Sequence, residues 1–319
     1  MDILKLIRDQ LDQIPPEYKN KIKVKPVITH IERAQYFLDI AKSLRDDHFY
    51  TDVIYRVNQA FEGILKEAYI FLAEKDADNK KTYQIENYLL KNKILNQRVS
   101  DLFKNYRQNW RNPSTHDYNL SFSEDEAFMA VVSVSAFVKI LLNQITAKMV
   151  YKVEKSEIET GKSLPIILRR DYKKLSLEQQ VSSMLVSFVR YVKKARKDLL
   201  DNHIKFHAGI AAYMKAVDPS LEILSDMQSP EPKIRLKTRP NFFISKNNKH
   251  LILEAKLGYK KTYVDDAGFR LFTYLTSLKS KIGILYFADL DRENYMAIRE
   301  IRNIDNEEYV IIKIVPRET

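Results

Sequence analysis

Two charged residues follow an apolar run in the second half of the sequence. The run Leu251-Ile252-Leu253 predicts a strand, and Glu254 and Lys256 flank Ala255 directly after it. Because side chains alternate along a strand, the carboxylate and the ammonium group point to the same face. A carboxylate can bind Mg²⁺, and a neighbouring lysine can orient or help deprotonate the water that attacks a phosphodiester. The spacing is therefore compatible with phosphodiester hydrolysis at the end of this strand, and an inert sheet with a surface Glu–Lys pair is the alternative.

A second segment is expected to lie beside this strand. Arg239-Pro240-Asn241-Phe242 opens another apolar run, and Lys246-Asn247-Asn248-Lys249 has the composition of a hairpin turn. Pairing of the two strands brings position 241 close to Glu254 and Lys256. We therefore expect position 241 to be part of the same site.

Another candidate site lies in the first half of the chain, where a predicted helix ends. Pro113 disfavours helical geometry at Asn112, so Arg111, Asn112 and His116 are expected to project from the helix end and the following turn. A permanently charged arginine can hold a phosphate, and a histidine that titrates near neutrality can move a proton. Together they suffice for metal-independent RNA cleavage by the ribose 2′-hydroxyl. An ordinary helix cap is the alternative that this spacing leaves open.

The composition limits which chemistry these sites can use. The 319 residues include no Cys, which excludes disulfides, Cys-ligated zinc, iron–sulfur clusters and thiol nucleophiles. The 53 Lys and Arg residues exceed the 42 Asp and Glu residues, so the net charge is +11. Residues 1–150 contain 22 basic and 20 acidic side chains, which leaves 31 and 22, or +9, for residues 151–319. A polyanion is the expected partner of the second half, because each neutralised phosphate releases counterions. A merely solubilising surface is the alternative.

The sequence shows no sign of export or membrane insertion. No uninterrupted apolar run reaches the ~20 residues that a membrane span needs. The start Met1-Asp2-Ile3-Leu4-Lys5 lacks the long apolar stretch of a secretion signal. We therefore expect a cytoplasmic protein that does not contact a membrane.

Residues 1–150 are predicted to form an antiparallel bundle of four or five helices. Apolar residues recur at intervals of three and four between Phe49 and Ala73, which is typical of a helix with one buried face. The segments 29–32 and 123–126 fit capping boxes, so helices are expected to start there. The second box opens a long apolar helix at 127–149.

The rest of the chain has a different pattern. Residues 151–175 are rich in charge and are interpreted as a linker. In residues 176–319, a helix capped by Ser176 precedes short runs of β-branched and aromatic residues, with one further helix near 266–278. This order indicates a mixed α/β domain. The predicted fold class is therefore a two-domain α + α/β protein, with a helical bundle first and a mixed sheet second.

The helical half resembles the HEPN family of small helical bundles over residues 29–148. The family hallmark is an arginine, a polar residue, three variable residues and a histidine, which Arg111, Asn112 and His116 match. HEPN domains commonly dimerise with their motifs facing each other in a composite RNase site. Other members keep the fold for dimerisation, nucleotide binding or partner contact. The resemblance therefore implies a homodimer, with RNA cleavage as one of its possible roles.

The second half resembles the PD-(D/E)XK restriction-endonuclease-like nucleases over residues 176–290. The resemblance rests on Pro240-Asn241 opening one strand and on Glu254-Ala255-Lys256 ending the next. It implies that Asn241, Glu254 and the Ala255 carbonyl hold Mg²⁺, with Mn²⁺ as a substitute, and that Lys256 positions the attacking water. Glu178, early in the Ser176-capped helix, occupies the place of an additional metal-site acid in many members.

One residue departs from the pattern of these nucleases. The family has Asp where this sequence has Asn241, and the amide keeps the shape and one oxygen but removes the charge that attracts a divalent cation. Two interpretations are open: a naturally degraded site, or a deliberate Asp-to-Asn inactivation. The retention of Glu254, Lys256 and Glu178 favours the second.

Other residues are expected to contact the substrate. The resemblance places Arg270 and Tyr274 on a helix that faces nucleic acid. A solvated face is the alternative for the basic cluster in the helix after Ser176. His203 and His207 lack the surroundings of a zinc motif and are interpreted as an ordinary, partly exposed pair. The basic residues that could line a DNA path are Lys193, Lys194, Arg196, Lys197, Lys237, Arg239, Lys260, Lys261 and Arg270.

The leading functional hypothesis is a Mg²⁺-dependent DNA endonuclease that a HEPN-like domain dimerises. Both resemblances point to prokaryotic anti-phage defence effectors, which implies control by a defence-system partner or an activating nucleotide. One alternative is a metal-independent HEPN ribonuclease or toxin whose degenerate C-terminal domain binds nucleic acid. The other is a non-catalytic DNA-binding scaffold.

Overall fold

The computed structural model describes most of the chain. The described residues are 2–92, 94–95, 97–111, 121–160, 171–225, 240–289, 291–292 and 294–317. Contacts divide the chain into two compact units, Met1–Met149 and Val150–Thr319. Each unit is described by itself below.

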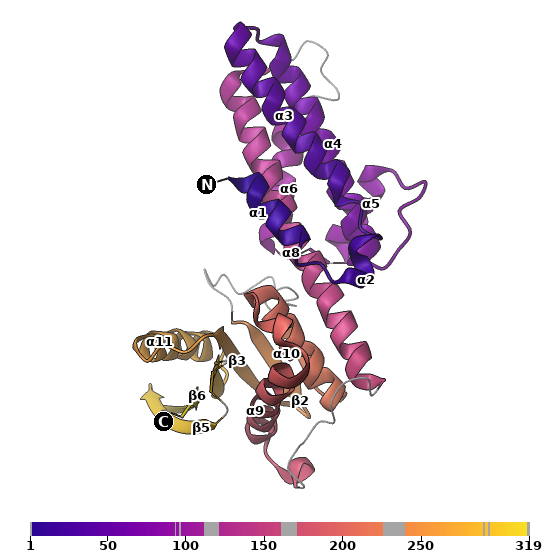
Figure 1. Cartoon of the computed structure of the whole chain (residues 1–319). Coiled ribbons are helices and arrows are strands. Elements are labelled where there is room, and N and C mark those ends of the chain that lie inside the picture. The colour runs from indigo at the N-terminus through magenta and orange to yellow at the C-terminus, as the bar shows by residue number, and fades with distance from the viewer. Residues whose placement is uncertain are drawn as a thin grey trace. The chain divides into compact units, whose positions relative to one another are not determined.

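The first unit is helical, as predicted from its periodicity (Figure 1). Its core is centred on Phe61, whose ring centroid lies 4.7 Å from that of Tyr106 and 5.1 Å from that of Phe137. Fully buried aromatic rings of this size contribute much of the apolar burial that stabilises a helical bundle. The helices are α1 (Ile3–Leu11), α2 (Pro16–Lys19), α3 (Val24–Leu44), α4 (His48–Phe71), α5 (Thr82–Lys91), α6 (Gln97–Tyr106), the π-helix η1 (Arg107–Arg111) and α8 (Glu124–Glu159).

The two predicted capping boxes have different outcomes. Ser123 and Glu126 form one: the Glu126 N–H donates to Ser123 Oγ at 3.3 Å, and the Ser123 N–H donates to Glu126 Oε2 at 2.8 Å. The prediction of a helix start at Thr29 is wrong, because α3 begins at Val24 and Thr29 lies inside it. The Thr29 hydroxyl donates to the Lys25 carbonyl instead. Pro26 is compatible with this earlier start, since first-turn positions have no N–H partner within the helix.

Helix α8 extends beyond the expected end at Met149. It continues to Glu159, so residues 151–159 are helical rather than linker. By length and apolar composition it resembles a membrane span, but 56% of its most apolar window is buried inside the structure. Such burial is typical of a core helix in a bundle.

The second unit contains a six-stranded mixed sheet with the order β1-β2-β3-β4-β6-β5. The pairs β1–β2, β2–β3 and β5–β6 are antiparallel, whereas β3–β4 and β4–β6 are parallel. The chain is therefore α plus β overall. The elements are η2 (Tyr172–Lys174), α9 (Leu177–Ala195), η3 (Lys197–Leu200), α10 (His203–Val217), β1 (Glu222–Ser225), β2 (Phe242–Lys246), β3 (Lys249–Leu257), α11 (Thr262–Ser277), β4 (Ile282–Ala288), β5 (Tyr295–Ile304) and β6 (Glu307–Pro316).

Helices cover both faces of this sheet. Figure 1 shows α9 and α10 on one side and α11 on the other. Leu285 packs in the core beneath α11, whereas its neighbour Tyr286 donates a hydrogen bond to the Leu185 carbonyl of α9 at 3.2 Å. Odd-numbered residues of β4 therefore face α11, and even-numbered residues face α9. Residues of adjacent strands that pair in register with them face the same way.

Two elements of this unit were not predicted. Helix α10 is buried around most of its circumference, so it lacks the one-sided apolar stripe that marks an amphipathic helix. Strand β5 is largely exposed and mixes apolar with charged residues. The run predicted as a strand at 234–236 lies outside the described residues.

Candidate functional site

The β2–β3 hairpin positions the first part of the site. Its turn residues Asn247 and Asn248 have φ values of 49° and 62°, which asparagine tolerates better than most residues and which match a tight hairpin turn. The turn sets a register in which Phe242 pairs with Leu253. Asn241 therefore lies beside the end of β3, as the sequence predicts.

Three hydrogen bonds join the residues at this place. The Asn241 N–H donates to Glu254 Oε1 at 2.8 Å, and the Ala255 N–H donates to Asn241 Oδ1 at 2.9 Å. Lys256 Nζ donates to Glu254 Oε2 at 2.8 Å. We refer to Asn241, Glu254, Ala255 and Lys256 as the Glu254 cluster.

The Glu254 carboxylate is buried but fully hydrogen-bonded. Glu254 is only 4% exposed, and both of its oxygens accept a hydrogen bond within the cluster. A buried carboxylate without such partners would cost several kcal/mol of folding free energy. Glu254 pairs in register with Leu285, which places the cluster on the α11 face of the sheet.

The strand ends directly after the cluster. Gly258 has a φ of +82°, which residues with a Cβ rarely adopt, and its N–H donates to the Ala288 carbonyl at 2.8 Å. This bond joins the carboxyl ends of the parallel strands β3 and β4. Ligands of open α/β sheets commonly bind at that edge.

His207 also contacts the cluster, although its sequence surroundings indicate only an ordinary pair with His203. Its Nε2 lies 3.1 Å from the Ala255 carbonyl oxygen. Burial lowers the pKa of His207 to about 4, so the ring is neutral at physiological pH and can donate one N–H to this carbonyl. Because a carbonyl oxygen has two lone pairs, Ala255 keeps one for another ligand. His207 comes from α10, and its position depends on how that helix packs.

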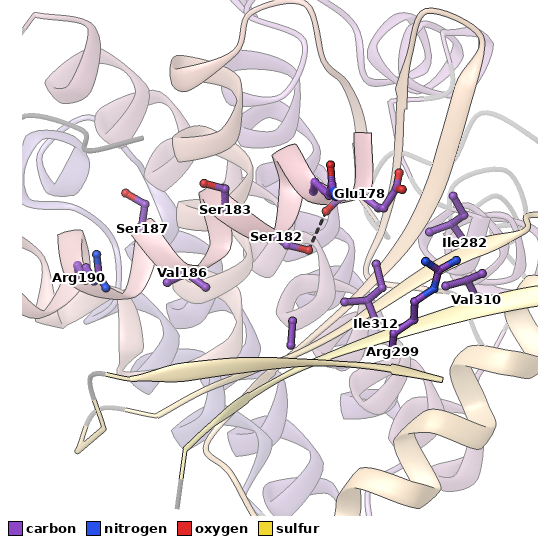
Figure 2. Close-up of a pocket in the computed structure, with 12 residues that line it drawn as sticks. Glu178, Ser182, Ser183, Val186, Ser187, Arg190, Ile282, Arg299, Val310 and Ile312 are labelled. Atoms are coloured by element: carbon purple, nitrogen blue, oxygen red, sulfur yellow. Dashed lines mark hydrogen bonds between the residues drawn. The ribbon is translucent and has the colours of Figure 1, made fainter. Parts of the chain in front are cut away.

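Glu178 is not brought to the Glu254 cluster. It lies near the start of α9 and lines a pocket with Ile282 and Val310 (Figure 2). Ile282 and Tyr286 are four residues apart on β4 and therefore share the α9 face, whereas Glu254 lies on the α11 face. The assignment of Glu178 as an additional metal-site acid is therefore corrected.

Arg196 forms ion pairs within the protein and does not lie free on the surface. Its guanidinium forms ion pairs with the fully buried Glu154 of α8, with Glu157 at 2.7 Å and with Asp198 at 3.0 Å. Tyr191 of α9 also donates to Glu154, at 3.1 Å. Glu154 and Glu157 belong to the part of α8 that lies in the second unit, so these contacts hold that segment against α9, and the assignment of Arg196 to DNA binding is corrected.

The Arg196→Ala variant is expected to lose about 3 kcal/mol of unfolding free energy, because Glu154 remains buried without its counter-charge. The exposed neighbour Lys197 is the matched control, and Lys197→Ala is expected to change stability by less than about 0.5 kcal/mol. Urea denaturation followed by circular dichroism measures both. Equal stability of the two variants would contradict this role.

Tyr274 also differs from its expected role. It is buried in the core between α11 and the sheet, so its ring does not face a substrate. A resemblance in sequence does not fix the rotation of α11 about its axis, and this rotation turns Tyr274 toward the core. Arg270, on the same helix, is exposed.

The remaining basic residues fall into three groups. Lys194, Lys197, Lys260 and Lys261 are exposed, with Lys260 Nζ 5.5 Å from the centroid of the Tyr263 ring. Lys193 is half-buried and donates to the Arg292 carbonyl at 2.8 Å. Lys237 and Arg239 lie outside the described residues.

The motif of the first unit is only partly within the described chain. The backbone of Arg111 ends η1, while its side chain, Asn112 and His116 lie outside the described residues. Arg107, at the start of η1, pairs with the buried Glu86 of α5 at 3.4 Å. A π-helical turn is rare and often occurs at functional sites. The Glu86–Arg107 pair therefore anchors the turn that precedes the motif.

The Glu254 cluster fits Mg²⁺ in ligand type but is poor in charge. A carboxylate, a backbone carbonyl and an amide oxygen are the hard donors that this ion prefers. Only Glu254 is anionic, and Lys256 balances its charge. Within the described ranges, no group of three or more His, Cys, Asp or Glu side chains could hold a metal ion.

Comparison with known proteins finds a match within the first unit only. Residues 28–145 match the family model of the HEPN domain. No curated protein and no solved structure matches the chain. The match includes η1 and the whole predicted Arg–His motif, together with the helices before and after it.

Proposed function

Given a HEPN domain over residues 28–145, we propose that this protein is a nuclease whose second unit hydrolyses DNA at the Glu254 cluster with bound Mg²⁺. The observation that carries the proposal is the convergence of Asn241, Glu254 and Lys256 through hydrogen bonds of 2.8 and 2.9 Å. The +9 charge of residues 151–319 supports a polyanionic substrate.

The topology of the second unit supports a PD-(D/E)XK-like domain. Helix α9 precedes the antiparallel strands β2 and β3, and α11 then leads to β4, which is parallel to β3. This order agrees with the one expected from the sequence of residues 176–319, in which a helix precedes the strands and a further helix precedes a later strand. The cluster lies at the end of β3, where that family has its acid and lysine.

Each residue of the cluster has a distinct role in the proposed reaction. Glu254, the Ala255 carbonyl and Asn241 would hold the ion, which when bound stabilises negative charge on the phosphate and acidifies water. Lys256 holds the attacking water through its remaining N–H groups. His207 donates a hydrogen bond to the Ala255 carbonyl and so helps to fix the orientation of this carbonyl group. The neutral Asn241 keeps the rate low.

The order of cleavage rates tests this proposal. DNA cleavage in Mg²⁺ is measured for the unchanged chain, Asn241→Asp and Glu254→Gln. We expect Asn241→Asp to be fastest and Glu254→Gln to be inactive. A non-catalytic scaffold predicts DNA binding without cleavage by any of the three.

A metal-independent ribonuclease in the first unit is the second candidate function. The HEPN match and the anchored turn η1 before Arg111 favour it. Arg111 would hold the phosphate, and His116 would move the proton of the ribose 2′-hydroxyl. In this case the second unit contributes nucleic-acid binding.

We also propose that the first unit forms a homodimer. Phe128, Met129 and Val132 lie within about one turn at the start of α8 and are 50%, 48% and 39% exposed. The opposite side of this turn, including Ala127 and Val131, is buried in the bundle, so α8 is apolar on both faces. An exposed apolar face of this kind commonly marks a protein interface.

The double variant Phe128→Glu/Val132→Glu is expected to convert the dimer into a monomer, because it buries two charges in the interface. Light scattering during size-exclusion chromatography measures the mass. Tyr83→Glu, at a 52% exposed aromatic residue on α5, is the control and should remain dimeric. A monomeric unchanged chain would refute the dimer.

The biological setting follows from both resemblances. HEPN modules and nucleases of the proposed type both recur in prokaryotic defence against phage. We therefore propose a cytoplasmic defence effector that a partner protein or a nucleotide activates. Phage plaque counts with and without the gene test this setting.

A further inference from the structure

A pocket of about 620 Å³ lies between α9 and the β4–β6–β5 part of the sheet (Figure 2). It is on the opposite face of the sheet from the Glu254 cluster, so the proposed nuclease chemistry does not use it. Pockets that bind small ligands commonly have volumes of about 300 to 1,000 Å³.

The floor of this pocket is apolar and incompletely covered. Ile282, Val310 and Ile312 lie next to one another across β4 and β6, and each remains partly exposed. The side chains of Val181, Met184 and Leu185 of α9 are fully buried, so the helix is already packed on its inner side. The floor therefore offers an apolar surface on which a planar ring can pack.

Two arginines line this pocket. Arg299 of β5 and Arg190 of α9 both line it, and neither forms an ion pair with any residue that the structure describes. By contrast, Arg302 and Lys313 on the other face of the same hairpin both pair with Glu300. Arginine forms paired, charge-assisted hydrogen bonds with phosphate. The pocket is therefore suited to an anionic ligand.

The wall that α9 contributes is polar. Ser183 and Glu178 line the pocket, and their side-chain oxygens have no hydrogen-bond partner among the described residues. A hydroxyl and a carboxylate can bind the amino group of a base or the hydroxyls of a ribose. Twelve residues separate Glu178 from Arg190, which is about 18 Å along a helix. The distance between these two residues is therefore longer than a single nucleotide.

We propose that this pocket binds a nucleotide of one or two units. The phosphates contact Arg299 and Arg190, a base packs on Ile282, Val310 and Ile312, and Ser183 and Glu178 bind its polar edge. Either a free nucleotide or the end of a strand can supply these groups. The site is independent of the Glu254 cluster, because its residues come from the other face of the sheet.

Calorimetry on the full chain in EDTA tests the proposal. The probes are AMP, the dinucleotide pApA, a ten-nucleotide single strand and inorganic phosphate. We expect pApA to bind, and Arg299→Ala and Arg190→Ala each to weaken its binding at least tenfold. Arg33→Ala, at an exposed arginine of α3, is the matched control and should bind pApA like the unchanged chain.

The probes separate the sources of the ligand. Binding of AMP or pApA indicates a free nucleotide, and binding of the ten-nucleotide strand alone indicates a strand end. Either result supports the proposal if the two arginine variants weaken it. No binding, binding that both variants retain, or equal binding of inorganic phosphate overturns it. EDTA removes divalent metal, so failure of the nuclease proposal does not affect the outcome.

Discussion

The Asn241→Asp variant is expected to cleave DNA in Mg²⁺ at least ~100-fold faster than the unchanged chain, since positioned charge at a reacting phosphate is commonly worth this much. The substitution keeps an oxygen at the Oδ1 position, where the Ala255 N–H can still donate to it. It adds a second negative charge beside Glu254, which Lys256 alone no longer balances. The ligand set then attracts a divalent cation more strongly.

Metal binding by this variant has a readout that does not depend on turnover. A ligand that binds only the folded state raises the unfolding temperature. We expect Mg²⁺ to raise the melting temperature of Asn241→Asp more than that of the unchanged chain. Without Mg²⁺, the adjacent carboxylates repel each other and the variant melts earlier.

Two controls make this test specific. Asn248→Asp adds the same charge in the exposed hairpin turn, at a φ that Asp tolerates, and should change neither cleavage nor the effect of Mg²⁺. Asn241→Asp combined with Glu254→Gln should be inactive. If Asn241→Asp stays inert on DNA in both Mg²⁺ and Mn²⁺, the DNA endonuclease hypothesis is wrong.

The His116→Ala variant is expected to lose metal-independent RNA cleavage by about 10²- to 10⁴-fold, the usual contribution of a general acid–base group. Arg111→Ala should cause a comparable loss, because phosphate charge is then left unbalanced. The assay measures RNA cleavage in EDTA, which removes any contribution of divalent metal. DNA cleavage in Mg²⁺ should be unchanged in both variants.

A histidine outside the motif provides the comparison. His48 is exposed at the start of α4, and His48→Ala should cleave RNA like the unchanged chain. If His116→Ala keeps full activity, the motif is not a ribonuclease site and serves the dimer or a partner. If the chain cleaves neither RNA nor DNA, and Asn241→Asp is equally inert, the scaffold alternative gains support.

The parts of the site that the sequence predicted depend on neighbours along the chain. A two-residue asparagine turn is sufficient to pair β2 with β3, and strand alternation is sufficient to put Glu254 and Lys256 on one face. The Ser123–Glu126 box is equally local, since its atoms lie within one helical turn. Such features need no knowledge of the rest of the fold.

The errors concern residues whose roles depend on distant elements. Glu178 faces the pocket, and Tyr274 faces the core, because of the way in which α9 and α11 are rotated against the sheet. Arg196 pairs with carboxylates of α8 that lie about forty residues earlier in the chain. The sequence pattern indicates a linker at that place, so this pairing is not expected from it. Helix rotation and long-range pairing leave no periodic signal in a single sequence.

The sequence by itself therefore determined the helical and mixed α/β halves, the hairpin and the proximity of Asn241, Glu254 and Lys256. Only the tertiary structure decided which face of the sheet carries that cluster, that His207 contacts it, and that Arg190 and Arg299 line a pocket. The physical reason is the distance along the chain over which each effect acts. Backbone geometry and side-chain alternation act over a few residues, whereas these placements result from the packing of whole helices on the sheet.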